Sequence, residues 1–135
     1  MNKIISLNNL QLKTFTEQDV LDYCSINNIN SDNITVLDLS HNELTDIFGI
    51  KLFKNLNDLW LNDNNLTDIS DLKNLNYLRE LDLNNNKIED ISAVKNMSSI
   101  FSLDISDNLI SEISVLSNLN YLKNLKIINL KLESD

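Results

Sequence analysis

Residues 56–66 read LNDLWLNDNNL, and this stretch decides the fold because its frame returns every 22 residues. The same apolar and Asn positions recur in residues 34–44 (ITVLDLSHNEL), 78–88 (LRELDLNNNKI) and 100–110 (IFSLDISDNLI). The second half of each repeat also agrees, with aligned apolar residues at Ile47, Ile69, Ile91 and Ile113. Self-similarity at a fixed period of this length predicts a solenoid, in which each unit buries its apolar face against its neighbours.

The middle of each frame alternates apolar and variable residues, as in Leu59-Trp60-Leu61. This period of two predicts a short strand whose apolar members point into the core and whose middle residue points outward. One such strand per repeat predicts an α/β solenoid with a curved parallel sheet of about six short strands. The ninth residue of each frame is Asn, whose amide offers donors and acceptors to the backbone of the turn. We expect these residues to form a buried ladder: Asn42, Asn64, Asn86 and Asn108.

The return path of each repeat has room for only a turn or two of helix. A serine begins three of these paths and is predicted to cap the turn: Ser70, Ser92 and Ser114. An acidic column precedes the turns, where helix dipoles favour negative charge: Asp46, Asp68, Asp90 and Glu112. A lysine column lies on the convex side: Lys51, Lys73 and Lys95. We interpret both columns as structural or solvated.

Residues 1–33 depart from the frame and are predicted to form an N-terminal cap made of a degenerate strand and a helix. Residues 7–12, with Leu at the first, fourth and sixth places, are predicted to be the strand. Thr16 and Asp19 have the spacing of a capping box, so we expect a helix from about residue 17 to residue 26. This helix would shield the N-terminal end of the core.

Residues 34–121 are four regular repeats, and residues 122–135 are a partial fifth repeat that ends at the C-terminal edge. Leu130 stands where the frame requires Asn, so the ladder should stop there. The last strand, expected at residues 125–132, has no obvious capping element. Because an apolar edge strand invites pairing, we expect something to cover it. The alternatives are a second copy, which would give self-association, the partner, or the terminal residues.

The composition excludes several classes of function. A chain of 135 residues predicts one domain, and its net charge of −9 disfavours direct binding to nucleic acid or to an acidic membrane. The single cysteine, Cys24, precludes an intramolecular disulfide and is predicted to be a small buried residue. The sequence shows neither a signal-peptide pattern nor an apolar run near the roughly 18 residues of a membrane span. We therefore expect a cytoplasmic location, in the source cell or in a host cell.

No pattern in the sequence indicates catalysis. His41 is the only histidine, and no Ser or Cys nucleophile is predicted at a fixed geometry beside it. Gly49 is the only glycine, so a Gly-rich phosphate loop is absent from the sequence. Nothing resembles a zinc cluster or a calcium loop. We expect no enzymatic activity, no catalytic residue, no cofactor and no metal site.

The unit L-x-x-L-x-L-x-x-N-x-L-x-D-I-S-x-L-x-x-L, as it stands in residues 56–75, resembles the 22-residue leucine-rich repeats. Bacterial internalins and the regulatory subunits of protein phosphatase 1 share this unit, and the resemblance covers residues 34 to about 127. It implies a leucine-rich repeat solenoid that binds other proteins through its concave sheet. The chain departs from the internalins in lacking a visible signal peptide, Pro in the return turn and an anchoring region. It departs from the phosphatase regulators in having far fewer repeats, so neither family's partner carries over.

The third, fifth, seventh and eighth residues of each frame are predicted to face outward on the concave side. Seven of these sixteen residues are acidic and none is Lys or Arg, while Lys13 and Lys126 flank them. Trp60, the only tryptophan, lies mid-strand among these acids and is predicted to anchor an interface. The predicted partner-binding residues are Trp60, Asp38, His41, Asp58, Asp63, Glu80, Asp82, Asp104 and Asp107.

Two functions of different class follow from this surface. The first is a non-catalytic module that binds another protein with a basic surface through an acidic concave face. The alternative is a small acidic inhibitor of the anti-defence or anti-CRISPR kind. Such an inhibitor would mimic nucleic acid and block the basic groove of a nucleic-acid-handling enzyme.

Overall fold

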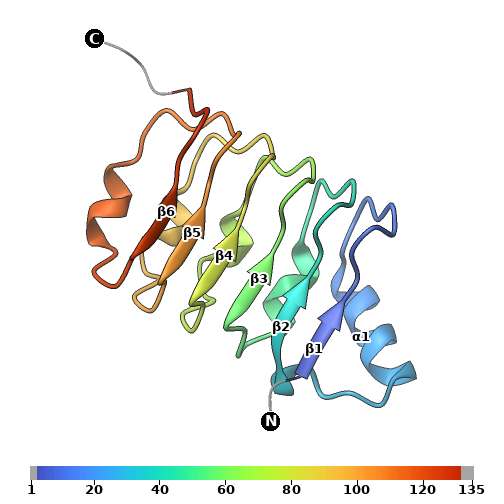
Figure 1. The fold of residues 1–135 in the computed structure, drawn as a ribbon. Helices are drawn as coiled ribbons and strands as arrows, with labels where there is room; N and C mark the ends of the chain where they lie inside the picture. Colours follow the sequence, from blue (N-terminus) through green and yellow to red (C-terminus); the bar gives the residue numbers. More distant parts are fainter. Residues whose placement is uncertain (1–2, 132–135) are drawn as a thin grey trace.

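The computed structural model describes residues 3–131, which form one open, curved sheet of six parallel strands in chain order (Figure 1). The strands are β1 (Lys3–Ser6), β2 (Ile34–Asp38), β3 (Asp58–Trp60), β4 (Glu80–Asp82), β5 (Ser102–Asp104) and β6 (Asn124–Lys126). One α-helix among these residues, α1 (Glu17–Ile26), lies at the N-terminal end of the solenoid. The predicted fold class is confirmed.

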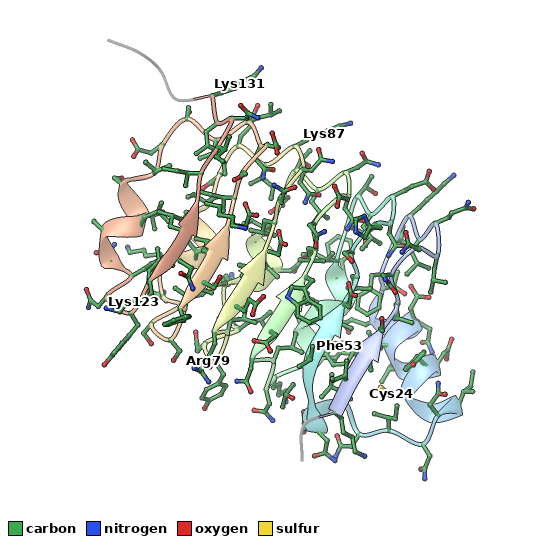
Figure 2. The ribbon with its side chains drawn as sticks, viewed as in Figure 1. Cys24, Phe53, Arg79, Lys87, Lys123 and Lys131 are labelled. Atoms are coloured by element: carbon green, nitrogen blue, oxygen red, sulfur yellow. The ribbon has the colours of Figure 1, made fainter. Side chains whose placement is uncertain are left out.

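Among the described residues, four short 3₁₀-helices lie in the return paths on the far side of the sheet: η2 (Phe48–Leu52), η3 (Ser70–Leu72), η4 (Ser92–Val94) and η5 (Ser114–Asn118). A further one, η1 (Ser31–Asn33), immediately precedes β2. The core lies between the return paths and the strands. The middle residues of β3, β4 and β5, which are Leu59, Leu81 and Leu103, are each at most 1% exposed. Phe53 and Cys24 belong to the same buried cluster (Figure 2).

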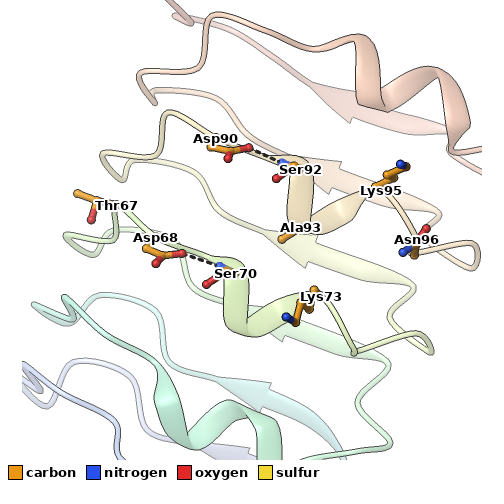
Figure 3. Close-up of a pocket in the computed structure, with 9 residues that line it drawn as sticks. All are labelled: Thr67, Asp68, Ser70, Lys73, Asp90, Ser92, Ala93, Lys95 and Asn96. Atoms are coloured by element: carbon orange, nitrogen blue, oxygen red, sulfur yellow. Dashed lines mark hydrogen bonds between the residues drawn. The ribbon is translucent and has the colours of Figure 1, made fainter.

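The return turns are held by the acidic column, and the predicted serine caps are wrong. Asp68 and Asp90 each accept a hydrogen bond from the backbone N–H of the serine two residues later, Ser70 or Ser92, at 2.8 Å (Figure 3). The capping positions are Ile69 and Ile91, which have no polar side chain. The serines are instead the first helical residues, and the carboxylate before each turn satisfies the N–H of that residue.

The same contact shifts the titration of these acids. The hydrogen bonds from the serines lower the pKa values of Asp68 and Asp90. Glu112 follows the pattern, since it accepts from Ser114 at 2.7 Å and its pKa is lowered for the same reason. Asp46 is the exception, because its buried Oδ1 has no hydrogen-bond partner within the described part of the chain. Three of the four acids in the column therefore have a structural role.

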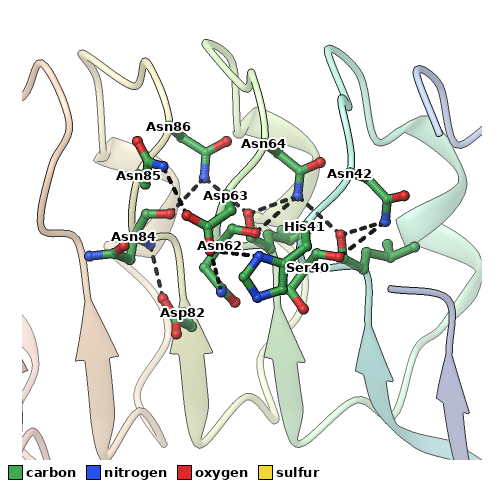
Figure 4. A network of polar contacts seen from close by, with 12 residues as sticks. Ser40, His41, Asn42, Asn62, Asp63, Asn64, Asp82, Asn84, Asn85 and Asn86 are labelled. Atoms are coloured by element: carbon green, nitrogen blue, oxygen red, sulfur yellow. Dashed lines mark hydrogen bonds and ion pairs between the residues drawn. The ribbon is translucent and has the colours of Figure 1, made fainter. Parts of the chain in front are cut away.

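The asparagine ladder is present as predicted (Figure 4). Asn64 is 7% exposed; its Oδ1 accepts from the N–H of Leu44, and its amide nitrogen donates to the carbonyls of Leu39 and Leu61. Each ladder residue thus serves the backbone of its own repeat and of the preceding one. Asn86 and Asn108 repeat this arrangement one and two repeats further along.

The N-terminal cap is built by α1. The capping box is confirmed, with Thr16 Oγ1 accepting from the Asp19 N–H at 3.1 Å and Asp19 Oδ2 accepting from the Thr16 N–H at 2.8 Å. Phe15, immediately before the cap, stacks on Phe53 with ring centroids 6.3 Å apart. Cys24 is buried as predicted, and burial raises the pKa of its thiol.

The predicted position of the first strand is wrong. The strand is β1, and its Ile5 lies opposite Leu37 of β2, so residues 7–12 follow the strand rather than form it. Leu10 thereby occupies the place of the ladder asparagine, and its N–H donates to Asn42 Oδ1. Lys13 is correspondingly displaced from the concave face, because its carbonyl accepts from the Thr45 N–H beyond the turn.

The sheet ends at β6, which has no neighbour on its outer side within residues 3–131. Leu125 is 39% exposed and Ile128 is 67% exposed. Leu132, the end of the predicted last strand, lies outside the described residues, so what covers this edge stays a prediction.

No helix in the described part is long and apolar enough to span a membrane. The cytoplasmic location also stays a prediction.

Candidate functional site

Trp60 lies on the outward face of the third strand of the sheet. Its neighbours Leu59 and Leu61 are fully buried, whereas Trp60 is partly exposed, as the alternation predicts. Parallel pairing places Asp38 of β2 and Asp82 of β4 directly beside it. The indole N–H donates to Glu80 Oε1 at 3.1 Å, which fixes one edge of the ring.

The fifth position of the frame carries aspartate in three of the four repeats, and the structure gives each a local role. Asp38, Asp82 and Asp104 each accept, through Oδ1 and at 2.9 Å, the backbone N–H of the residue two places later. This contact is the Asx turn that carries the chain out of the strand. Trp60 occupies the same position and provides no carboxylate for the turn. The Asx turn therefore does not explain why tryptophan occupies this position.

The eighth position of the frame has a left-handed backbone. The φ angles are 56° at His41, 60° at Asp63, 56° at Asn85 and 54° at Asp107. Asn, Asp and His tolerate this region better than most residues. His41, Asp63 and Asp107 therefore have a structural reason to be polar that does not involve a partner.

The eighth-position side chains also contact one another across the repeats (Figure 4). His41 Nδ1 lies 3.0 Å from Asp63 Oδ2, and Asn85 donates to Asp63 Oδ1 at 2.8 Å. Asn129 donates to Asp107 Oδ1 at 2.8 Å in the same manner. These contacts line the edge of the sheet where the strands end.

Burial and neighbouring charges raise the pKa values of two acids on the concave face, Asp82 and Asp58. Burial raises the pKa of Asp82, opposed by the hydrogen bond from the Asn84 N–H and reinforced by the nearby charges of Asp104 and Asp63. Burial also raises the pKa of Asp58, with a further increase from Glu80 and a decrease from Arg79. The cost of holding these carboxylates ionised falls when a cation approaches.

Three positions predicted to face outward are buried instead. Val36 is 7% exposed, Ser40 is 6% and Ser106 is 4%. Ser40 Oγ donates to Asp38, and Ser106 Oγ accepts from the Ile128 N–H, so both hydroxyls face neighbouring polar groups. Trp60 and the acids at the third and fifth positions remain at least partly exposed.

Sequence reasoning missed the exposed aromatic residues near the starts of the strands. Tyr77 is 60% exposed, Phe101 is 42% and Tyr121 is 67%. The sequence does contain a sign of them, because these aromatic residues replace polar residues, such as Asn33 and Asn55, at the aligned positions of the first two repeats. Elsewhere, no group of three or more His, Cys, Asp or Glu within residues 3–131 is arranged to hold a metal ion.

Comparisons with known proteins agree with this geometry. A family model described as Leucine Rich repeats (2 copies) matches residues 32–74 and 54–96. An internalin (inlF) from Listeria monocytogenes is similar over 96% of this chain, with 33% identity and a TM-score of 0.82. A leucine-rich repeat protein from Leptospira interrogans is similar over 96%, with 29% identity and a TM-score of 0.80. No curated protein matches the sequence.

A third similar structure is the functional domain of InlJ from Listeria monocytogenes, with 28% identity over 96% of this chain and a TM-score of 0.71. The chain spans only 35%, 32% and 28% of the lengths of these three structures. Solenoids of this kind present extended concave binding surfaces and are typically non-catalytic scaffolds for protein–protein contacts. The repeats, the sheet and the structural neighbours together show that the chain is a leucine-rich repeat protein.

Proposed function

We propose that this chain is a non-catalytic module that binds a basic surface of another protein on its concave face, around Trp60. The position of Trp60 carries the proposal. This residue lies between Asp38 and Asp82 on an inner strand, is partly exposed, and has no role in the turn that aspartate serves in the other repeats. Partly exposed tryptophans surrounded by polar groups are typical anchors of interfaces.

The carboxylates around Trp60 suit a cationic partner. Asp58 and Glu80 lie side by side at the third position, and Asp82 and Asp104 at the fifth. Neighbouring strands are about 4.8 Å apart, so the four carboxylates form two short adjacent rows. The raised pKa values of Asp58 and Asp82 show that both pay a desolvation cost, which a bound Lys or Arg would offset. Such charges mainly speed association.

A defined basic probe tests the charge of the partner. A blocked peptide containing Arg and Leu is compared with the same peptide in which Gln replaces Arg, and binding is measured by calorimetry over a range of salt concentrations. We expect only the Arg peptide to bind, with an affinity that falls as salt rises. Asp82→Asn with Asp104→Asn should weaken binding and flatten this dependence. Asp22→Asn with Asp32→Asn, two exposed acids away from the face, is the matched control.

Capture of the natural partner tests the role of Trp60. Native protein and Trp60→Ala are used as paired baits in extract from the source cell, and the dissociation rate of each captured protein is measured. Loss of a central aromatic anchor costs about 2 kcal/mol or more, so the variant should release a true partner at least about thirtyfold faster. A partner that leaves both baits at the same rate, or that is acidic, would refute the proposal.

The inhibitor remains the alternative, and the two adjacent rows of carboxylates favour it. An inhibitor of this kind would compete with nucleic acid for its partner, whereas an adaptor would not. The discriminating measurement is the displacement of the captured partner by duplex DNA or RNA. Complete displacement with a matching loss of the partner's enzymatic activity supports the inhibitor. A ternary complex supports the adaptor.

We also propose that the outer edge of β6 mediates self-association. Leu125 and Ile128 are exposed there, and the backbone groups of the strand have no neighbour on that side within the described residues. Light scattering over a concentration series should show a dimer that Ile128→Lys dissociates. Lys substituted for Leu21, an exposed residue of α1 at the other end, should not. A concentration-independent monomer would contradict self-association.

A further inference from the structure

A second surface lies where the strands begin. We call it the strand-start patch, and it consists of three exposed aromatic rings and two cations: Tyr77, Arg79, Phe101, Tyr121 and Lys123. Figure 2 shows Arg79 and Lys123 at the same edge of the sheet, near the starts of β4 and β6. The other labelled lysines, Lys87 and Lys131, lie at the opposite edge.

The backbone fixes the order of these side chains. The carbonyl of Arg79 accepts the N–H of Phe101 at 2.8 Å, and the carbonyl of Phe101 accepts the N–H of Lys123 at 2.9 Å. The three residues are therefore consecutive rungs of one column, at the roughly 4.8 Å spacing of neighbouring strands. A hydrophobic rung thus lies between two cationic rungs.

A hollow forms beside this column because one aligned residue is small. Tyr77, Ser99 and Tyr121 share a position in successive repeats, and Ser99 separates the two tyrosines. The hollow is open and shallow, with a volume of about 410 Å³, and is lined by Arg79, Ser99, Phe101 and Tyr121. Its walls are therefore two aromatic rings and a guanidinium, with a hydroxyl between them.

The cations of the patch form no ion pair among the described residues, although Arg79 lies near Asp58 and Glu80. Arg79 is the only arginine in a chain of net charge −9. Neither Arg79 nor Lys123 forms an ion pair within residues 3–131, whereas Lys51 contacts both Glu17 and Asp71. Tyr and Arg are enriched among the residues that dominate interface energies, and Arg pairs with carboxylates through two parallel hydrogen bonds.

We propose that the strand-start patch is a second protein-binding site that takes a partner segment carrying a carboxylate next to an apolar side chain. The carboxylate pairs with Arg79, and the apolar side chain enters the hollow against Phe101 and Tyr121. This site differs from the concave face in location and in the charge of what it binds. The chain would therefore hold a basic partner on the sheet and an acidic segment at its edge.

The surrounding charge favours a single carboxylate over a nucleic acid. Aromatic rings and cations together also suit stacked bases and phosphates. Asp58 and Glu80, however, border Arg79, and the charge of Arg79 already lowers the pKa of Asp58. Each phosphate added to a bound chain increases the repulsion from these acids, whereas a single carboxylate carries one charge that Arg79 can pair with.

Selection from a displayed library of short random peptides tests the proposal with the full chain as bait. We expect the enriched peptides to carry Asp or Glu beside an aromatic or aliphatic residue. A charge-assisted pair contributes enough for Arg79→Gln to weaken a synthesised winner about tenfold. Lys87→Gln, at the opposite edge, should leave its affinity unchanged. Phe101→Ala should also weaken it, whereas Phe48→Ala, which removes a ring on η2 that is 53% exposed against 42% for Phe101, should not.

The other outcomes would contradict the proposal. Failure to enrich any peptide, or winners that bind Arg79→Gln as tightly as the native chain, would overturn the proposal. Basic winners that depend only on Trp60 would overturn it while leaving the concave-face proposal intact. Binding of a short oligothymidylate that requires Arg79 and Phe101 would replace the peptide with nucleic acid. Unchanged melting of both variants shows that each result reports the patch and not the fold.

Discussion

The side-chain oxygen of Asn86 accepts a hydrogen bond from the backbone N–H of Leu66, one repeat earlier, at 3.0 Å. Its amide nitrogen donates to the carbonyl oxygens of Leu61 and Leu83 at 3.0 and 3.1 Å. Asn86 is 6% exposed, so these backbone groups have no access to bulk water in its place. One side chain thus satisfies buried groups in two successive repeats and couples the stability of one repeat to the next.

Replacing Asn86 by Leu should therefore destabilise the whole solenoid. The apolar side chain has the same branched arrangement of non-hydrogen atoms but leaves a buried donor and two buried acceptors without this partner, at a cost of about 1–3 kcal/mol. Urea denaturation followed by circular dichroism measures the change. Asn76→Leu is the control, because the Asn76 side chain is exposed. Equal midpoints for the two variants would reject the ladder as a source of stability.

The left-handed eighth position makes a separate prediction at Asp107. Its φ is 54°, a conformation that costs an ordinary L-residue about 1–2 kcal/mol and a β-branched one at least as much. Asp107→Val should lower stability by about that amount, while Asp107→Asn keeps both the backbone preference and the acceptor for Asn129. Thermal melting compares the two. If Val and Asn are tolerated alike, the polar residue at this position has no backbone role.

Gly49 allows the first return turn to touch the N-terminal cap. A Cβ at this residue would lie 2.5 Å from the carbonyl oxygen of Thr16 and 2.8 Å from Val20 Cγ2. The aligned residue two repeats later is Ala93 of η4, whose neighbours are η3 and η5 and not the cap. Gly49→Ala should displace α1 and cost about 1–3 kcal/mol of overpacking, whereas Ala93→Ser should be nearly neutral. Native-state hydrogen exchange would locate the damage, and unchanged protection across α1 would contradict the prediction.

The regular part of the fold was predictable because the spacing of the apolar residues and the position of the asparagine indicate the same register in each of the four repeats. Leu59, Leu61 and Asn64 together allow only one register. The first strand was misplaced because Ile5, Leu7, Leu10 and Leu12 fit the apolar spacing in more than one register. An asparagine at the ladder position would have distinguished these registers, but Leu10 occupies that position, so the sequence alone did not identify the correct one.

The candidate site was predictable in outline, but the reasons for its residues were not. Alternation places Trp60 outward in both sequence and structure. In the sequence, His41, Asp63 and Asp107 suit a binding surface, but Asn, Asp and His are also the residues that a left-handed turn favours. Similarly, the return turns have two plausible cap donors, Ser70 and Asp68, and only the geometry distinguishes them. At such positions the sequence shows which residue is present but not why it is there.

Asp82 and Asp68 should respond to pH with opposite signs when each is replaced by asparagine. Burial raises the pKa of Asp82 above its ordinary 3.8, so its charge opposes folding at neutral pH. Hydrogen bonds from Ser70 lower the pKa of Asp68 below 3.8, so its charge favours folding above that pH. At pH 7, Asp82→Asn should therefore raise the melting temperature, because Asn keeps an acceptor for the Asn84 N–H, and Asp68→Asn should lower it.

Both differences should shrink as the pH falls, because protonation makes each native aspartate neutral like the asparagine that replaces it. The Asp82 difference should disappear as the pH falls through its raised folded pKa to below 3.8. The Asp68 difference should persist to lower pH, because the native chain loses that stabilisation only as the pH falls through the lowered folded pKa. Calorimetric melting of the native chain and both variants from neutral to acidic pH tests the order. Differences of the same sign at pH 7, or an Asp68 difference that vanishes first, would mean that burial does not govern the concave carboxylate.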